Sequence, residues 1–397
     1  MILQQQNDIT VRPLNASINT DKRSVIIEWK DGTTSTYPFV WLRDNDPAGF
    51  HPDTRERQFD ISTINLNDEI SEINLGEDAM EFSWRLEGYT AKYNLSWLHA
   101  HRSGRQKDPI EEIEIKHWRG ELAQKGIPRY GVKGLIQSDA ELLTFLRDTR
   151  ARGISIINGL EDDPESDTTL GRRAGFLRET NFGRIFEVRS KPQPTNLAYT
   201  SLALPMHTDL PNQELVPGYQ FLHCIKNEAV GGSSIFCDGF AIAEDMRESD
   251  PEYFDLLANT SIPFRYHDDE FDIRGRQKII NLDASGHVIE ICFNAHLSDT
   301  LDLPVTLMEN YYRAYQIFML KAKQSSYTVS AKLCGGEMVV FDNRRILHGR
   351  EAFDTQTGVR YLRGFYIDRG DLESRIRVLA RAEYLDHADQ CQVTEGN

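Results

Sequence analysis

Three residues of this chain have the types and the spacing of a metal site: His207, Asp209 and His348. Side chains alternate along an extended segment, so His207 and Asp209 point to the same side and can bind one ion. His348 follows far downstream, after the apolar run 336–343. Two imidazoles and one carboxylate on one face of a metal leave positions open for a chelating co-substrate and dioxygen, which suits Fe(II). The triad therefore predicts an oxygenase.

Two arginines follow the last of these residues. Arg360 and Arg363 lie in segment 359–367, which alternates like a strand. Arginine is always charged and can bind a carboxylate through two hydrogen bonds. If this strand returns beside His348, one guanidinium can hold the distal end of a metal-chelating dicarboxylic acid. The alternative is that both arginines form ordinary surface ion pairs, and His-x-Asp alone is a weak signal in a chain with 11 histidines.

The triad and Arg360 resemble the pattern of the 2-oxoglutarate-dependent Fe(II) oxygenases of the taurine dioxygenase-like superfamily. Within that superfamily the chain is most similar to the γ-butyrobetaine and trimethyllysine hydroxylase branch. The similar stretches are 41–45, 196–200, 222–226, 231–234 with 238–240, and 341–350. The resemblance runs over nearly the whole chain, so it is more specific than the triad.

The resemblance implies Fe(II) as the metal, with 2-oxoglutarate and O₂ as co-substrates. His207, Asp209 and His348 would ligate the iron, and no catalytic group beyond the metal centre is expected. Arg360 would hold the distal carboxylate of 2-oxoglutarate, with Ser234 as a hydroxyl partner and Arg363 as a nearby support. The expected reaction is hydroxylation of an unactivated C–H bond, to which the protein contributes positioning.

The resemblance also implies an aromatic cage that holds a trimethylammonium group by cation–π attraction. The matching positions are Phe182, Phe186, Tyr199 and Tyr366. Where relatives have Tyr and Trp this chain has the two phenylalanines, so we expect weaker binding of a quaternary amine. The spacing of Phe182 and Phe186 is also typical of an ordinary core stripe.

The acidic end of such a substrate would meet Asn196, but the second asparagine of the relatives falls on Ala295. A buried carboxylate without a partner loses affinity, so either the polar end differs or Asn294, His296 or Arg184 substitutes. These departures leave open a related oxygenase of specialised metabolism that desaturates or rearranges another small molecule. A non-enzymatic binding module is disfavoured by the complete triad.

Relatives also have a structural zinc site, with a cysteine cluster just after the stretch that matches 41–45. This chain has no cysteine before Cys224, and Asp46 with His51 is not a tetrahedral zinc set. We therefore expect no zinc.

Composition narrows the partners and the compartment. The net charge of −16 argues against non-specific nucleic-acid binding. The start of the sequence lacks a signal-peptide pattern, and no apolar run is long enough to span a bilayer. The five cysteines show no paired short spacing, which predicts reduced thiols and a cytoplasmic protein. The resemblance implies a small-molecule substrate and a homodimer.

The elements that must position these residues separate into two regions. Residues 1–100 predict a small β-rich domain, with a hairpin over 24–41 and short strands near 61–73 and 80–86. Residues 101–115 are polar and read as a linker, and 116–397 form the catalytic domain. There we expect a strand at 153–160 and helices at 140–147, 305–323 and 372–385. The predicted class is α+β, with a double-stranded β-helix (jelly-roll) core and flanking helices.

Overall fold

The computed structural model describes residues 12–101, 113–160, 163, 165–190 and 197–394. The chain divides into two compact units, Met1–Asp108 and Pro109–Asn397. Most of the predicted linker, 102–112, lies outside the described residues. Each unit is therefore considered by itself.

The N-terminal unit consists of two antiparallel three-stranded sheets, β1–β2–β3 and β4–β5–β6, around one apolar core. The strands are β1 (Pro13–Asn19), β2 (Ser24–Trp29), β3 (Thr34–Pro38), β4 (Ile70–Leu75), β5 (Ala79–Trp84) and β6 (Thr90–Asn94). Two short helices follow the sheets, α1 (Phe39–Asp44) and α2 (Leu95–Ala100). In β2, Val25, Ile27 and Trp29 are fully buried on one face, whereas Ile26 on the other face is only partly buried and Glu28 is exposed, as the two-residue period of a strand requires.

Two boundaries in this unit differ from the prediction. The hairpin strand expected to reach residue 41 ends at Pro38, because Pro38 precedes helix α1 and Phe39 and Leu42 turn into the core. Residues Ile61–Thr63, expected in a strand, form one 3₁₀ turn that is capped by Asp60. Alternating apolar residues over a short run do not distinguish these cases.

The segment after α1 corresponds to the place where the resemblance puts a cysteine cluster in relatives. In this chain, hydrogen bonds and cation–π contacts hold the segment in place. Asp46 accepts hydrogen bonds from the Ala48 amide and from the Tyr89 hydroxyl. The Arg43 guanidinium lies 4.6 Å from the ring centre of Phe59 and 3.9 Å from that of Tyr89. Asp46 is thus already bonded within the protein, and the absence of zinc stays a prediction.

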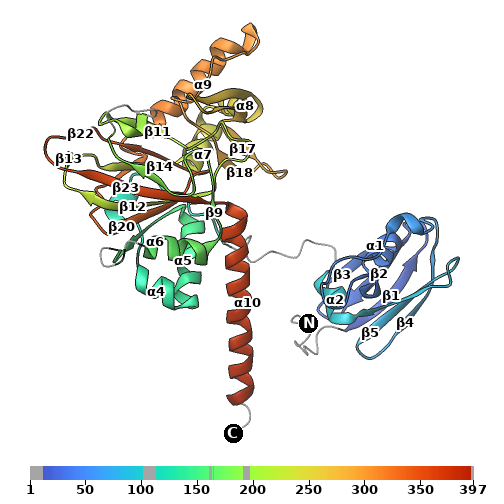
Figure 1. Ribbon diagram of the computed structural model, residues 1–397. Helices are drawn as coiled ribbons and strands as arrows, with labels where there is room; N and C mark the ends of the chain where they lie inside the picture. Colours follow the sequence, from blue (N-terminus) through green and yellow to red (C-terminus); the bar gives the residue numbers. More distant parts are fainter. Residues whose placement is uncertain (1–11, 102–112, 161–162, 164, 191–196, 395–397) are drawn as a thin grey trace. The chain divides into compact units, whose positions relative to one another are not determined.

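The C-terminal unit is built on two sheets (Figure 1). The larger has the order β10–β23–β12–β20–β8–β7, with β9 beside β23, and is antiparallel apart from the β7–β8 pair. Its strands are β7 (Arg129–Gly131), β8 (Ile154–Asn158), β9 (Leu177–Arg178), β10 (Phe186–Val188), β12 (Tyr219–Asn227), β20 (Glu337–Asp342) and β23 (Arg360–Ile367). The smaller has the order β11–β21–β14–β19. Its strands are β11 (Leu204–His207), β14 (Ser234–Asp238), β19 (Thr328–Ala331) and β21 (Ile346–Arg350).

Three two-stranded pairs complete the strands of this unit. They are β13 (Val230–Gly231) with β22 (Phe353–Asp354), β15 (Ser261–His267) with β16 (Asp272–Lys278), and β17 (Ile280–Leu282) with β18 (Val288–Ile291).

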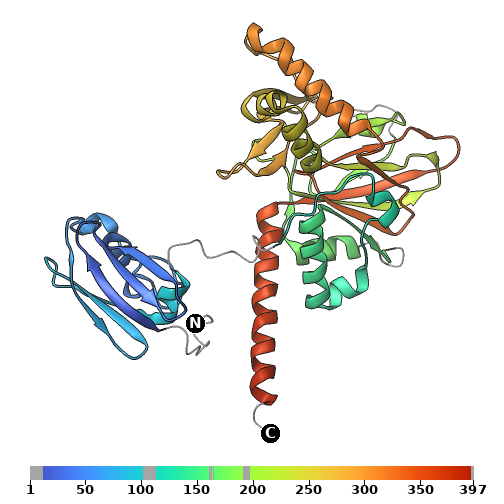
Figure 2. The same cartoon turned by 180° about the vertical axis from the view of Figure 1, so that it is seen from behind.

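Helices cover the outer face of each sheet, as Figures 1 and 2 show from opposite sides. The larger sheet packs against α4 (Val132–Gln137), α5 (Asp139–Arg152), α6 (Ser166–Ala174) and α10 (Arg369–Thr394). The smaller sheet packs against α7 (Gly239–Ser249), α8 (Pro251–Asn259) and α9 (Val305–Lys323), and α3 (Leu122–Lys125) is short. A third apolar cluster lies between the sheets. This arrangement agrees with the α+β class and the two-sheet core expected from the sequence.

Local signals account for the helices well. In α5, Ser138 caps the first turn by accepting from the Glu141 amide, and Gly153 ends the helix in the left-handed conformation at φ +77°. The bounds of α9 match the predicted range, and α10 begins before and extends beyond the predicted 372–385. Among the described residues, no helix is long and apolar enough to cross a membrane.

Candidate metal centre and pocket

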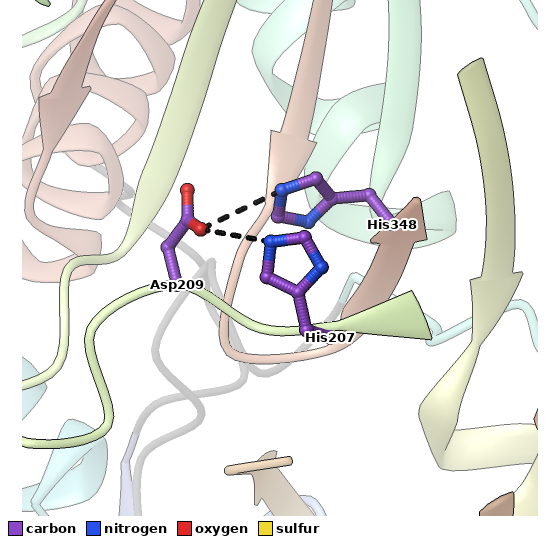
Figure 3. Close-up of side chains that lie close together, drawn as sticks. All are labelled: His207, Asp209 and His348. Carbon is purple, nitrogen blue, oxygen red and sulfur yellow. Dashed lines mark ion pairs between the residues drawn. The ribbon is translucent and has the colours of Figure 1, made fainter. Parts of the chain in front are cut away.

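The structure brings the three predicted metal ligands together on the inner side of the smaller sheet. His207 and His348 are cross-strand neighbours on β11 and β21, and Asp209 follows two residues after the end of β11. The Asp209 Oδ1 atom lies 3.2 Å from His207 Nε2 and 3.6 Å from His348 Nε2 (Figure 3). One ligand atom from each residue fits within 4.8 Å of the others. Two imidazoles and one carboxylate at this separation can hold one divalent ion.

Hydrogen bonds outside the triad orient the ligands. His207 Nδ1 lies 2.8 Å from the Pro205 carbonyl, which leaves Nε2 for the metal. The Asp209 amide donates to Asn343 Oδ1 at 2.6 Å, and Asn343 Nδ2 donates back to the Asp209 carbonyl. The following residue, Leu210, has a φ of +56°, which is strained for a leucine. Asp209 is therefore placed by a turn held to the β20–β21 connection.

Asn294, expected to contact the substrate, has its amide occupied within this turn. Its Nδ2 donates to the Thr208 carbonyl at 3.0 Å, and its Oδ1 accepts from the amides of His296 and Leu297. Thr208 also pairs with the backbone of Phe293. Asn294 lines the pocket, and its side chain is bonded to Thr208, the residue between His207 and Asp209.

The electrostatics of the triad suit metal binding. Burial alone raises the pKa of Asp209, but His348, His207 and the Tyr366 hydroxyl outweigh it and hold that pKa well below its usual range. Burial, reinforced by His207, lowers the pKa of His348 to about 3. The carboxylate is therefore charged and the His348 imidazole neutral at neutral pH, which is the state that a metal requires.

A pocket of about 340 Å³ adjoins the triad. Seven of the other residues that the sequence assigned to the co-substrate or substrate line it: Phe182, Phe186, Tyr199, Ser234, Asn294, Arg360 and Tyr366. Strand pairing explains the convergence of segments far apart in the chain, because β10, β23 and β12 are neighbours in the larger sheet. Asn196 lies outside the described residues.

Arg360 is suited to an anionic ligand. The residue is 7% exposed, and burial lowers its pKa to about 10, so it remains charged at neutral pH. Its Nε donates to the Gly232 carbonyl at 3.2 Å, and within the described part of the chain it forms no ion pair with a carboxylate. A buried cation without a counter-charge is costly unless a ligand supplies one. Arg360, Ser234 and the triad in one pocket thus fit a chelating dicarboxylate such as 2-oxoglutarate.

Two predicted site residues do not join the pocket. Arg363 was expected to support the co-substrate, but it lies on the opposite face of β23, where its guanidinium bonds to Asp167 at 2.7 and 2.8 Å. Residues an odd number of positions apart on a strand face opposite sides, so Arg360 and Arg363 cannot share one ligand. Arg184 is largely exposed and lies 3.9 Å from Glu179, outside the pocket lining.

Aromatic rings form one wall of the pocket. Phe186 stacks on Tyr366 with ring centres 5.1 Å apart, and Tyr366 donates its hydroxyl to Asp209 Oδ2 at 2.7 Å. Phe182 meets Tyr266 edge to face at 5.2 Å. Tyr266, on β15, is a further ring that the sequence reading did not identify, because β15 carries no part of the recognised motifs.

Three other polar residues of the pocket escaped the sequence reading or were only alternatives. Gln220 is 3% exposed, and its Oε1 is a buried acceptor with no partner among the described residues. Arg350 is 4% exposed and follows His348 by two positions. His296 lies with its ring centre 5.5 Å from that of His207. Gln220 is the cross-strand partner of Tyr366, so its side chain lies on the same face of the sheet. The pairing of β12 with β23 is therefore the signal that could have identified Gln220.

The sequence is similar to proteins of known activity. Residues 123–366 match the family described as taurine catabolism dioxygenase TauD, TfdA family, and residues 16–99 match gamma-butyrobetaine hydroxylase-like, N-terminal. Gamma-butyrobetaine dioxygenase of Pseudomonas sp. (strain AK-1) is 37% identical over 374 residues, which cover 94% of this chain and 97% of that protein. Homo sapiens gamma-butyrobetaine dioxygenase is 31% identical, with 89% and 93% covered. Homo sapiens mitochondrial trimethyllysine dioxygenase is 28% identical, with 87% and 83% covered.

Proposed function

We propose that this chain, which belongs to the TauD, TfdA dioxygenase family and to its γ-butyrobetaine hydroxylase-like branch, hydroxylates a small quaternary ammonium substrate. The chain is an Fe(II)- and 2-oxoglutarate-dependent dioxygenase, as its relatives and its triad indicate. What the proposal adds is the substrate class and the role of each side chain. One observation carries it: aromatic rings, most of them buried, line the same pocket as the triad and Arg360.

The contacts in the pocket support a role for each residue. His207, Asp209 and His348 would hold the iron, and Arg360 with Ser234 would hold the distal carboxylate of 2-oxoglutarate. When bound, iron and 2-oxoglutarate activate dioxygen and supply an oxidant that can remove hydrogen from an unactivated carbon.

The protein's own contribution is placement. Phe182, Phe186, Tyr199 and Tyr366 present apolar surface and ring faces, which attract a weakly hydrated cation and exclude water. The Tyr366 hydroxyl donates to Asp209, which fixes the orientation of the Tyr366 ring relative to the triad. A trimethylammonium group held against these rings would keep the neighbouring carbon chain beside the triad.

Turnover of matched compounds tests the substrate class. Succinate formation would be measured with γ-butyrobetaine, trimethyllysine and a neutral analogue of γ-butyrobetaine in which a tert-butyl group replaces the trimethylammonium group. We expect substrate-dependent succinate with at least one cation and little with the neutral analogue, with hydroxylated product identified by mass spectrometry. Equal turnover of the neutral analogue would overturn the cation proposal, and a desaturated or rearranged product would favour an oxygenase of specialised metabolism.

A matched pair of variants connects the effect to the pocket. Phe182→Leu removes a ring from the pocket wall, whereas Phe176→Leu removes one that is 79% exposed and outside it. Loss of a cation–π contact of about 1–2 kcal/mol should raise the KM of the cationic substrate roughly 5- to 30-fold in Phe182→Leu only. If both variants behave like the parent, the ring wall does not bind the cation.

A further inference from the structure

Arg350 joins the metal strand to the segment that carries Tyr199. It is the last residue of β21, and its guanidinium donates to the carbonyls of Ala198, Thr200 and Leu202 at 3.1, 2.7 and 2.8 Å. Tyr199 lies inside this span, in the 3₁₀ turn Leu197–Tyr199, and lines the pocket. The Arg350 side chain thus holds the backbone on both sides of Tyr199, whose ring belongs to the proposed cation site.

Arg350 and Arg360 are two buried cations on one aromatic ring. The Phe353 ring centre lies 4.9 Å from the Arg350 guanidinium and 5.6 Å from that of Arg360. Arg350 Nε is buried without a partner, and among the described residues neither arginine is paired with a carboxylate. Two like charges in a poorly solvated site repel each other, so an anion that binds there stabilises both.

A series of hydrogen bonds that involve the backbone also connects Arg360 with the segment that carries Tyr199. Arg360 Nε donates to the Gly232 carbonyl, the Gly232 amide donates to Ala352, and the Phe353 amide donates to Ser201, each at 3.1 or 3.2 Å. Gly232 has a φ of +71°, and a Cβ there would lie 3.0 Å from the Arg360 side chain. This close approach links the strand with Arg360 to the segment with Tyr199.

We propose that Arg350 is a positioning residue that couples the distal carboxylate of 2-oxoglutarate at Arg360 to the placement of Tyr199. An anion at Arg360 removes the repulsion on Arg350 and fixes the Phe353 ring, so the hydrogen bonds from Arg350 to segment 198–202 become stronger. The turn that carries Tyr199 is then held more rigidly in its pocket position when the co-substrate is bound than when it is absent. This inference rests on the proposed function for the meaning of Tyr199, but its hydrogen-exchange test does not require the substrate.

Hydrogen exchange of the backbone tests the coupling. The readout is the peptide that contains the Thr200 amide, which donates to the Leu197 carbonyl. Full-length protein with Fe(II) under anaerobic conditions would be compared with no addition, with 2-oxoglutarate, and with 2-oxopentanoate, which has a methyl group in place of the distal carboxylate. We expect 2-oxoglutarate to slow exchange of this peptide by about tenfold and 2-oxopentanoate to have little effect.

Arg350→Lys keeps the charge but cannot reach three carbonyls, so exchange should be fast and unresponsive to 2-oxoglutarate. The control Arg276→Lys changes an exposed arginine paired with Asp302 and should respond like the parent. In turnover assays, Arg350→Lys should raise the KM of the cationic substrate more than that of 2-oxoglutarate. Equal slowing by both keto acids, a parent-like response of Arg350→Lys, or an equal rise of both KM values overturns the proposal. If Arg350→Lys does not fold, the parent's response to the two keto acids still decides it.

Discussion

Both faces of the larger sheet have buried charged and polar side chains, but on one face they are paired with each other and on the other, in the part of the chain that the structure describes, they are not. On the outer face, Asp167 and His223 are each 1% exposed and bond to each other at 2.9 Å, and Arg363 donates to both oxygens of Asp167. On the inner face, which lines the pocket, Arg360 has no carboxylate within the described residues, and Gln220 Oε1 is buried without a partner among them. In the outer cluster the charged and polar groups bond to one another and stabilise the fold. In the pocket, polar groups keep bonding capacity that a ligand can use.

The largest expected effect separates these two roles directly. Asp209→Ala removes a metal ligand, so substrate-dependent succinate formation should fall on the order of a thousandfold, while the thermal midpoint of the apoprotein changes little. Activity is measured in metal-limited buffer and unfolding by calorimetry. Parent-level succinate in Asp209→Ala would remove Asp209 from the metal site.

Breaking the outer cluster should have the reverse effect. Arg363→Ala leaves the Asp167 carboxylate buried without its main cation, which costs about 3–5 kcal/mol of unfolding free energy. Urea unfolding measures this loss, and the KM for 2-oxoglutarate in the folded fraction should stay at the parent value. A large rise in that KM at unchanged stability would restore Arg363 to the co-substrate site.

The same cluster predicts a pH dependence of stability. Burial raises the pKa of Asp167, but hydrogen bonds and charge from His223 and Arg363 outweigh it, and the net pKa is lowered. A group whose folded-state pKa is lowered stabilises fully above its unfolded value of about 3.9, and that contribution is lost as the pH falls through the folded-state pKa. Unfolding free energy between about pH 6 and about pH 3 should therefore decline less in Asp167→Asn than in the parent. Parallel pH profiles would show that Asp167 contributes nothing to acid sensitivity.

The opposite fates of Arg360 and Arg363 also show what the sequence could predict. The triad was predicted from the residues themselves, whereas the role of Arg360 and the ring positions were implied by the family resemblance, and strand pairing brings all of them to one pocket. Arg363 was assigned wrongly to that pocket because the assignment did not use the two-residue period of β23. Arg350 and Tyr266 were missed since their roles depend on contacts with segments 198–202 and on the β15–β16 pair, which no local pattern indicates. The positions of these side chains depend on strand pairing and contacts between distant segments, which local sequence propensities do not reveal.

On the pocket face, Arg360→Ala should raise the KM for 2-oxoglutarate by the equivalent of about 2–4 kcal/mol, as for a lost charge-assisted pair. The KM for the cationic substrate should change much less, and stability should not fall, because Arg360 bonds to a single carbonyl rather than to a buried carboxylate. Initial rates at varied 2-oxoglutarate measure the first effect. A stability loss like that of Arg363→Ala, with 2-oxoglutarate binding unchanged, would make the two faces equivalent and remove the distinction.

The smallest effect tests whether the pocket rings act through their faces. Tyr199 is 8% exposed, and cation–π attraction depends on the ring rather than on the hydroxyl. Tyr199→Phe should therefore keep most of the affinity for a trimethylammonium substrate, whereas Tyr199→Leu should lose on the order of 1–2 kcal/mol. The corresponding rise in KM, roughly 5- to 30-fold, should vanish when the neutral tert-butyl analogue replaces the cation, because dispersion with leucine and with a ring is then similar. If Phe and Leu weaken binding equally, the Tyr199 hydroxyl is the group that contacts the substrate, and the ring wall is ordinary apolar packing beside a metal site.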